Sequence, residues 1–161
     1  MSPALQRLRA EIRFDRDAFA RRVGELASIE LSLGPERAAE RAQAAVAPTT
    51  PTAPSRASWV RVARYLEGDA PQGADWHQAL LHSMGLDVEG VRPAVFSPAT
   101  IRVLRRLLGF RHFFRHAYAV ELDADQLGIL RGEILAAAPA ILRGIDALDS
   151  FLARVAAAGS D

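Results

Sequence analysis

The chain has 161 residues, half of them hydrophobic. This is enough for one domain with a hydrophobic core that needs no disulfide or bound metal to fold. It has no cysteine, so disulfides, thiolate metal sites and cysteine nucleophiles are excluded. All 20 basic residues are arginine, against 19 acidic residues, so lysine Schiff-base chemistry is also excluded and the formal net charge is only +1. No apolar run is long enough to cross a bilayer and no secretory segment is evident, so we expect a cytoplasmic location.

Apolar residues recur at helical spacing along almost the whole chain, and no segment alternates as a strand would. A first helix is predicted from about Ser2 to Ala27, and a second from Pro35 to Val46. The apolar face of the first helix comprises Leu5, Leu8, Ile12, Phe19, Val23 and Leu26. Residues 47–55 are predicted to form a loop, because three prolines within seven residues cannot sit inside a helix. A third helix is expected from Arg56 to Glu67.

Capping residues mark the next two helices. Asp75 is the predicted N-cap of a short helix, Trp76 to Met84, which Gly85 closes. Ser97 and Pro98 combine an N-cap serine with proline at the first helical position, a strong start signal. The helix that they begin is predicted to run to about His116.

The last helical region is predicted to begin at Asp123, which forms a capping-box-like pattern with Gln126. Its apolar stripe comprises Leu127, Leu130, Ile134, Ala138, Ile141, Ile145, Leu148, Leu152 and Val155. Pro139 within this stripe is predicted to kink or split the helix. The chain is therefore expected to form a single all-α domain over residues 1–161, an up-and-down helical bundle.

The stretch from Glu89 to Glu121 contains no acidic residue between its two ends, which makes it the most positive part of the chain. It holds six arginines: Arg92, Arg102, Arg105, Arg106, Arg111 and Arg115. On a helical wheel, an aromatic side gathers Phe110, Phe113, Phe114 and Leu107, while Arg111, His112, Arg115 and His116 fall in an arc of roughly 140° on the other side. Arg105 shares that arc. The pattern predicts a helix that buries its aromatic side and presents guanidinium and imidazole groups together.

Arginine beside histidine suits phosphodiester cleavage in RNA. A histidine with a pKa of about 6.5 can take a proton from a 2′-hydroxyl or give one to the leaving oxygen. An arginine binds the phosphate bidentately and stabilises the extra charge of the transition state. If His116 supplies one proton-transfer group, the second must come from His112, a partner subunit or water.

The same residues carry a resemblance to a known family. Arg111-x4-His116, with His112 directly after the arginine, resembles the signature of HEPN-superfamily ribonucleases. With Tyr118 the pattern becomes Arg-x4-His-x-Tyr, the form found in HepT-like toxins of toxin–antitoxin pairs. The resemblance includes residues 73–81 and 108–123, and the chain is similar to HepT-like proteins over roughly Gly73 to Val155.

This resemblance implies a HEPN-like homodimer in which two motif helices form one composite RNA-cleaving cleft, with neither metal nor cofactor. Arg111 and His116 would be the catalytic pair, and His112, Arg115 and Arg105 would bind RNA, with tRNA as the expected substrate. Tyr118 would be AMPylated by a partner nucleotidyltransferase, the antitoxin. The loop predicted at residues 47–55 departs from the family, in which continuous helix is expected at that place.

Other interpretations of these residues remain open. The same arginine face suits a non-catalytic helical module that binds a nucleotidyltransferase or nucleic acid, or the chain is a structural dimeric bundle without RNA contact. Arg111 and Arg115 fit a solvated helix face, and His116 a capping residue. His112 and His116 have the i, i+4 spacing of metal ligands, but no carboxylate precedes Glu121 nearby. Tyr118 fits the edge of a core equally well.

Overall fold

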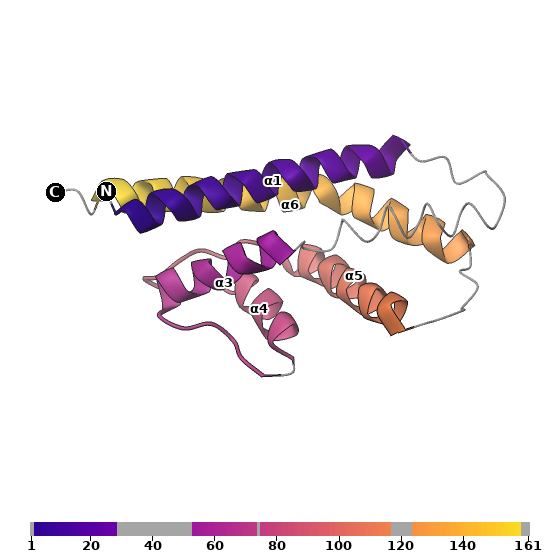
Figure 1. The fold of residues 1–161 in the computed structure, drawn as a ribbon, viewed down its shortest axis with the longest axis horizontal. Helices are drawn as coiled ribbons and strands as arrows, with labels where there is room; N and C mark the ends of the chain where they lie inside the picture. Colours follow the sequence, from indigo (N-terminus) through magenta and orange to yellow (C-terminus); the bar gives the residue numbers. More distant parts are fainter. Residues whose placement is uncertain (1, 29–52, 74, 117–123, 159–161) are drawn as a thin grey trace.

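The computed structural model describes residues 2–28, 53–73, 75–116 and 124–158; for 53–57, 110–116 and 124–127 it describes the backbone alone. These parts contain five helices: α1 (Pro3–Ser28), α3 (Ala53–Glu67), α4 (Trp76–Met84), α5 (Pro98–His116) and α6 (Ala124–Ala158). In the described residues the only extended pairing is an isolated β-bridge between Val88 and Arg92. The predicted all-α bundle is confirmed (Figure 1). The helix predicted over residues 35–46 lies outside the described residues.

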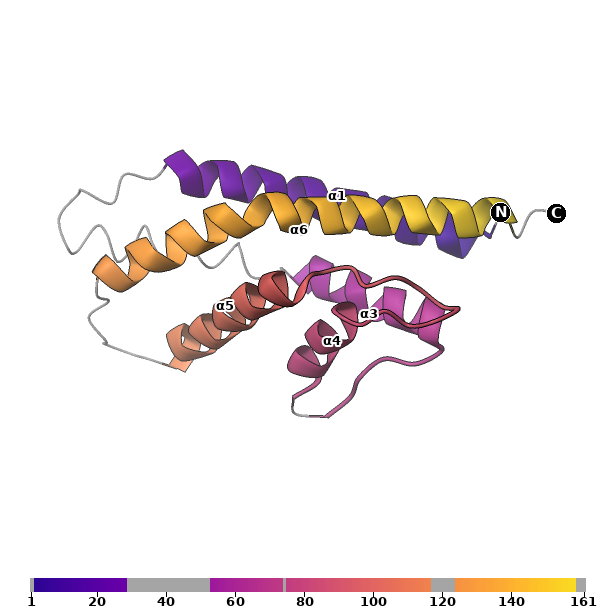
Figure 2. The ribbon, with the colours of Figure 1, turned by 180° about the vertical axis from the view of Figure 1, so that it is seen from behind.

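Helices α1 and α6 form the long axis of the molecule. They lie side by side and antiparallel, so the start of α1 and the end of α6 share one end of the bundle (Figures 1 and 2). Helices α3, α4 and α5 lie together on one side of this pair (Figure 1). Helix α5 packs against both α6 and α4, and α3 packs against α1 and α4. The helix that carries the Arg-x4-His motif is therefore held from two sides.

The core follows the apolar faces that the sequence predicts. In α1, Leu5, Leu8, Ile12 and Leu26 are buried, whereas Phe19 packs against the core while partly exposed. In α6 the buried residues are Leu130, Ile134, Ala138, Ile141, Ile145, Leu148, Leu152 and Ala156. Each large apolar side chain buried in this way stabilises the fold by about 1.5–3 kcal/mol. The 3–4 spacing thus indicated which faces meet, although Val23 and Val155, both predicted on these faces, are only partly buried.

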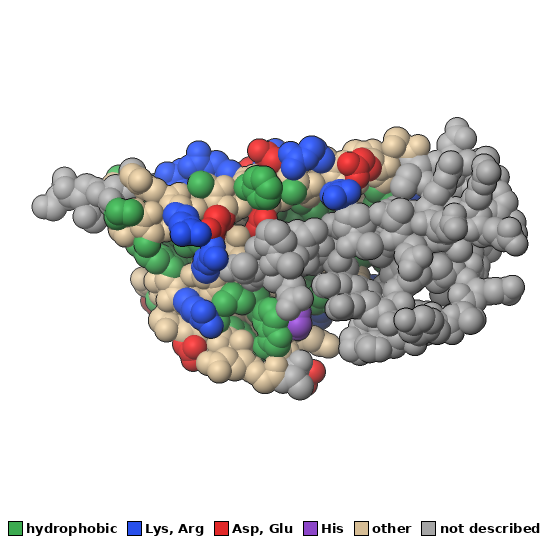
Figure 3. Space-filling view, in the orientation of Figure 1, with side chains coloured by type: hydrophobic (Ala, Val, Ile, Leu, Met, Phe, Trp, Pro, Cys, Tyr) green, Lys and Arg blue, Asp and Glu red, His purple; other side chains and the backbone are tan. Residues whose placement is uncertain are grey.

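Ion pairs between α1 and α6 fix how these two helices face each other. Arg9 donates from Nε and Nη2 to both carboxylate oxygens of Asp149, at 2.8 and 3.0 Å. Arg131 of α6 donates to the carbonyl oxygens of Leu26 and Ala27, at 3.0 and 2.7 Å, and so satisfies acceptors at the C-terminal end of α1. Figure 3 shows basic and acidic side chains interspersed along the α1 side of the molecule. Much of the arginine content is therefore used for intramolecular pairing.

The starts of α4 and α5 agree with the predicted positions, but only one cap forms as predicted. The backbone N–H of Thr100 donates to Oγ of Ser97 at 3.2 Å, which is the expected N-cap bond of α5. Asp75 precedes α4 as predicted, yet its side chain makes no capping hydrogen bond. Its carbonyl oxygen instead accepts from Gln78 and Ala79, at 2.9 and 3.1 Å. Gly85 closes α4 in a right-handed conformation, with φ −89°.

Helix α3 begins at Ala53, earlier than predicted. Residues 53–55 therefore belong to a helix rather than to the predicted loop, and residues 47–52 of that loop lie outside the described part. Pro54 occupies the first turn, where a missing N–H costs no helical hydrogen bond and the fixed φ of proline suits the helix. The loop prediction was wrong at this end because it treated Pro54 as a breaker.

Helix α6 continues across Pro139 without a break. Of the two outcomes predicted for Pro139, the split does not occur. Figure 2 shows that α6 bends along its length, and a kink at Pro139 itself stays a prediction. Farther along, Gly144 lies against the chain before α5: a Cβ there would clash with the carbonyl oxygen of Val95 and lie 2.9 Å from the Phe96 ring. A residue without a side chain therefore lets α6 approach the segment that leads into the motif helix.

Candidate nucleic-acid interface on helix α5

Helix α5 divides into a buried and an exposed side over the length for which its side chains are described. Ile101, Leu104 and Leu107 are buried, and Val103 packs partly buried against the same core. Arg102, Arg105 and Arg106 are exposed. The predicted separation of an apolar and a basic side is confirmed up to Gly109. Beyond it, the predicted burial of the aromatic side lies outside the described side chains.

The Arg-x4-His motif occupies the last turns of α5, since the helix is continuous to His116. The helical backbone places Arg111 and Arg115 one turn apart, and His112 and His116 likewise. The side chains of these four residues lie outside the described part, as does Tyr118 entirely. Their assignment as catalytic, RNA-binding and modified residues stays a prediction.

Arg105 is the one predicted RNA-binding residue whose side chain is described. It is exposed, and its Nη2 lies 3.4 Å from Nδ1 of His82, which is also exposed at the end of α4. This distance is at the long limit of a hydrogen bond, so the contact orients the guanidinium weakly and leaves most of its donors to solvent. Arg105 is therefore available to a phosphate, and His82 extends the same surface onto α4. No sequence pattern indicates that His82 belongs to this surface, because it lies on a different helix from Arg105.

Among the arginines of the positive segment whose side chains are described, Arg92 and Arg106 have acidic partners. Arg92 is buried, and it donates to Glu67 Oε1 at 2.8 Å and to the carbonyl oxygens of Ser83 and Leu86 at 2.8 and 3.1 Å. Arg106 forms an ion pair with Glu133 of α6. Acidic partners distant in sequence therefore reduce the positive charge available to a ligand. The sequence pattern, with no acidic residue between residues 89 and 121, suggested a larger positive charge than the folded protein presents.

The upstream motif, in which Trp76 and His77 follow Asp75, forms the start of α4. The two rings are in contact at a tilt, with centroids 3.7 Å apart and an interplanar angle of 31°. Trp76 packs partly buried against the hydrophobic core. These contacts support a structural role for Trp76, in which it anchors α4 beside α5.

No three His, Cys, Asp or Glu side chains among the described residues lie close enough together to hold a metal ion. The side chains of His112 and His116 are outside that set. In the described parts of the chain, no helix is long and apolar enough to cross a membrane.

The described residues form an all-α bundle, in which the capped, arginine-rich helix α5 ends in the Arg-x4-His motif. A family model described as HepT-like protein matches residues 57–152, more than half of the chain. The chain belongs to this HepT-like family of the HEPN superfamily. The matched region runs from α3 into α6 and contains Arg111, His116 and Tyr118. Comparison with curated proteins and with solved structures gave no match.

Proposed function

We propose that this protein is a toxin endoribonuclease, formed by a single HEPN-like domain over residues 1–161, that cleaves RNA without a metal ion. The observation that carries the proposal is the match to the HepT-like family across the Arg-x4-His motif, on a helix that is continuous to His116. The exposed arginines earlier on α5 give further support, because RNA is bound first through its phosphates.

The proposed reaction is internal attack of an RNA 2′-hydroxyl on the adjacent phosphorus. The 2′-oxygen loses its proton and bonds to phosphorus, while the bond to the 5′-oxygen breaks and that oxygen is protonated. The products are a 2′,3′-cyclic phosphate and a free 5′-hydroxyl. His116 transfers one of these protons, and Arg111 binds the non-bridging oxygens as charge develops on them.

A second proton-transfer group is needed, and a homodimer supplies it. Two copies of α5 that meet near their C-terminal ends bring two histidines to one phosphate. His112, Arg115 and Arg105 then bind the RNA on either side of the scissile bond. Guanidinium groups suit this task because their planar donors match phosphate oxygens in pairs. The proposed substrate is tRNA, as the resemblance implies.

Control of the toxin is proposed to act at Tyr118. A nucleotidyltransferase antitoxin transfers AMP to its hydroxyl, two residues after His116 in sequence. The added phosphate places negative charge beside the cleft, where it repels RNA and occupies space. The partner, the modification and the RNA cleft belong to one proposal, since silencing is useful only if the site is active.

The test compares RNA cleavage and growth arrest for the wild type, Arg111→Ala and His116→Ala, with and without EDTA. Arg143→Ala is the matched control, because Arg143 is an exposed arginine of α6. We expect loss of at least a hundredfold in cleavage rate for the two motif variants, none for the control, and no effect of EDTA. Equal cleavage by all variants would contradict the assigned pair. Cleavage that EDTA abolishes would indicate a metal-dependent site, and absence of both cleavage and toxicity a non-catalytic binding module.

A further inference from the structure

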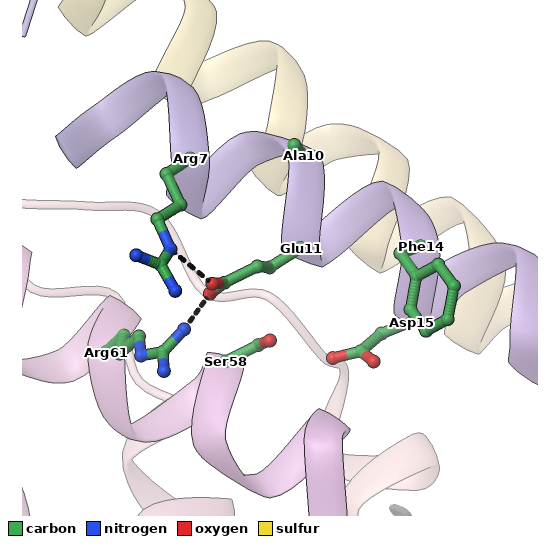
Figure 4. Close-up of a pocket in the computed structure, with 7 residues that line it drawn as sticks. All are labelled: Arg7, Ala10, Glu11, Phe14, Asp15, Ser58 and Arg61. Carbon is green, nitrogen blue, oxygen red and sulfur yellow. Dashed lines mark hydrogen bonds and ion pairs between the residues drawn. The ribbon is translucent and has the colours of Figure 1, made fainter. Parts of the chain in front are cut away.

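A cavity of about 440 Å³ that is open to solvent lies between α1 and α3, on helices other than the one that carries the Arg-x4-His motif (Figure 4). Its walls include Ala10, Glu11, Phe14 and Asp15 of α1, and Ser58 and Arg61 of α3. This volume is within the range of small-molecule sites in proteins. The cavity has no part in the proposed cleavage of RNA.

One wall of the cavity carries a buried carboxylate with an open acceptor. Asp15 is only 9% exposed, and its Oδ2 has no hydrogen-bond partner. Burial raises the pKa of Asp15; hydrogen bonding with Ser58 lowers it in part, and the nearby charge of Glu11 raises it further. A buried acceptor without a partner is unfavourable, so a ligand that donates to Oδ2 gains from pairing it.

The other charged groups of the cavity offset one another through ion pairs: Oε2 of Glu11 makes no hydrogen bond of good geometry, but it lies against the guanidinium of Arg61. Arg7 Nε lies 3.1 Å from Glu11 Oε1, and Arg61 forms a second ion pair with the same carboxylate (Figure 4). Because both arginines pair with Glu11, their hydrogen bonds hold the pKa of Glu11 below its usual value against the effect of burial. Asp15 is therefore the acidic group of this cavity that remains for a ligand.

The chemistry of the open acceptor selects the ligand. Only Oδ2 of the carboxylate has no partner, so a planar guanidinium has no second open oxygen for its fork, whereas the compact charge of an ammonium group can donate to Oδ2 alone. An anion would be repelled by Asp15 and would compete with Glu11 for the arginines. Ala10 is a small apolar wall, and Phe14, 63% exposed, adds an apolar edge. We propose that the cavity binds a primary alkylamine, whose ammonium group donates to Oδ2 of Asp15 and whose short chain lies along Ala10 and Phe14.

The test uses isothermal titration calorimetry at neutral pH to measure the affinity of the protein for three probes, each with a four-carbon chain. Butylamine is the ligand, 1-butanol the uncharged probe of similar size, and butylguanidine the probe with a forked cation. We expect butylamine to bind at least tenfold more tightly than either. Equal affinity for butylamine and 1-butanol would overturn the proposal, because the carboxylate would then contribute nothing. Absence of binding by every probe would mean that the cavity holds water alone, and would overturn it as well.

Two variants and one control locate the site. Asp15→Asn keeps the shape of the side chain but removes its charge, and should weaken butylamine binding at least tenfold. Asp17→Asn changes an exposed acid of the same helix and should leave it unchanged. Ala10→Leu places a larger side chain at the rim of the cavity while Asp15 stays intact, and should weaken binding even if Asp15→Asn proves poorly folded. Unchanged binding by either Asp15→Asn or Ala10→Leu in folded protein would place the amine elsewhere and refute the proposed site.

Discussion

Arg92 and Glu67 form a salt bridge that joins the segment before α5 to the end of α3, with Arg92 Nη2 lying 2.7 Å from Glu67 Oε1. The side chain of Arg92 is completely buried, and it also donates to Oγ and the carbonyl oxygen of Ser83 at 2.8 Å. The arginine nearest the start of the positive segment is thus a structural tie between α3, α4 and the segment that leads to the motif helix. Arg105, on the same segment, faces solvent.

Replacement of Arg92 by alanine is expected to destabilise the protein by about 3–5 kcal/mol, because it leaves the Ser83 carbonyl and the Glu67 carboxylate without their buried donor. Urea unfolding followed by circular dichroism measures this loss. Arg102→Ala is the control: its side chain is exposed, and the expected change is within about 0.5 kcal/mol. Similar stability of the two variants would show that Arg92 adds no net stability.

Arg105→Ala is expected to weaken RNA binding severalfold and to reduce by about one the slope of log affinity against log salt, as loss of one phosphate contact requires. Binding is measured in a His116→Ala background, so that RNA stays intact. His82→Ala should change the slope less, because among the described residues the only contact of His82 with this surface is its long one to Arg105. An unchanged slope for Arg105→Ala, equal to that of Arg143→Ala, would exclude Arg105 from the RNA surface.

Gly144→Ala is expected to destabilise the protein by about 1–3 kcal/mol, because the added Cβ would clash with the Val95 carbonyl oxygen and lie close to the Phe96 ring. Gly132→Ala provides the matched control on the same helix. No atom lies within 4 Å of a Cβ at Gly132, so alanine there should stabilise the helix by about 0.5–1 kcal/mol. Thermal melting of the two variants should therefore move in opposite directions, and a shared direction would contradict the close contact at Gly144.

Asp15→Asn is expected to stabilise the ligand-free protein at neutral pH. Because burial raises the pKa of Asp15 above its ordinary value of 3.8, the folded protein holds this proton more tightly than the unfolded chain. The stability that Asp15 contributes is complete below 3.8 and is lost as the pH rises through the folded-state pKa. Asparagine does not titrate, so its advantage should grow with pH and then level off.

Melting curves of wild type and Asp15→Asn from acidic to neutral pH measure this difference. We expect a higher Tm for Asp15→Asn than for wild type at neutral pH, and a smaller difference at acidic pH. Asp17→Asn is the control, since its carboxylate is 59% exposed and pairs with Arg16 at the surface. A constant difference between wild type and Asp15→Asn at every pH would rule out the raised pKa as the cause.

Local sequence signals predicted the helices well because each signal acts over a few residues. Ser97 and Pro98 determined the start of α5 through a cap and a fixed φ, and the 3–4 stripe of α6 indicated its buried face. Pro54 and Pro139 were harder to interpret, since proline is tolerated in a first turn and in a packed long helix. Asp75 marked the right position but by its backbone rather than its side chain.

The candidate site was predicted in part. Spacing along one helix gave the shared arc of Arg105, Arg111 and His116, and the helix does extend to His116. The use of Arg92 and Arg106 as structural partners was not predictable, since Glu67 and Glu133 come from distant parts of the chain. The cavity at Asp15 gave no signal either, because an aspartate within a helical pattern looks like any solvated residue.

By itself, the sequence determined the all-α class, the apolar faces, the family motif and its place at the end of a helix. These depend on residue type and on spacings of a few residues, which act within one element. Only the tertiary structure decided which arginines remain for a ligand and which acidic side chains become buried, with Arg92 tied to Glu67 and Asp15 enclosed against Ser58. Desolvation and ion pairing depend on which helices come together, and residues far apart in the chain meet only when it folds.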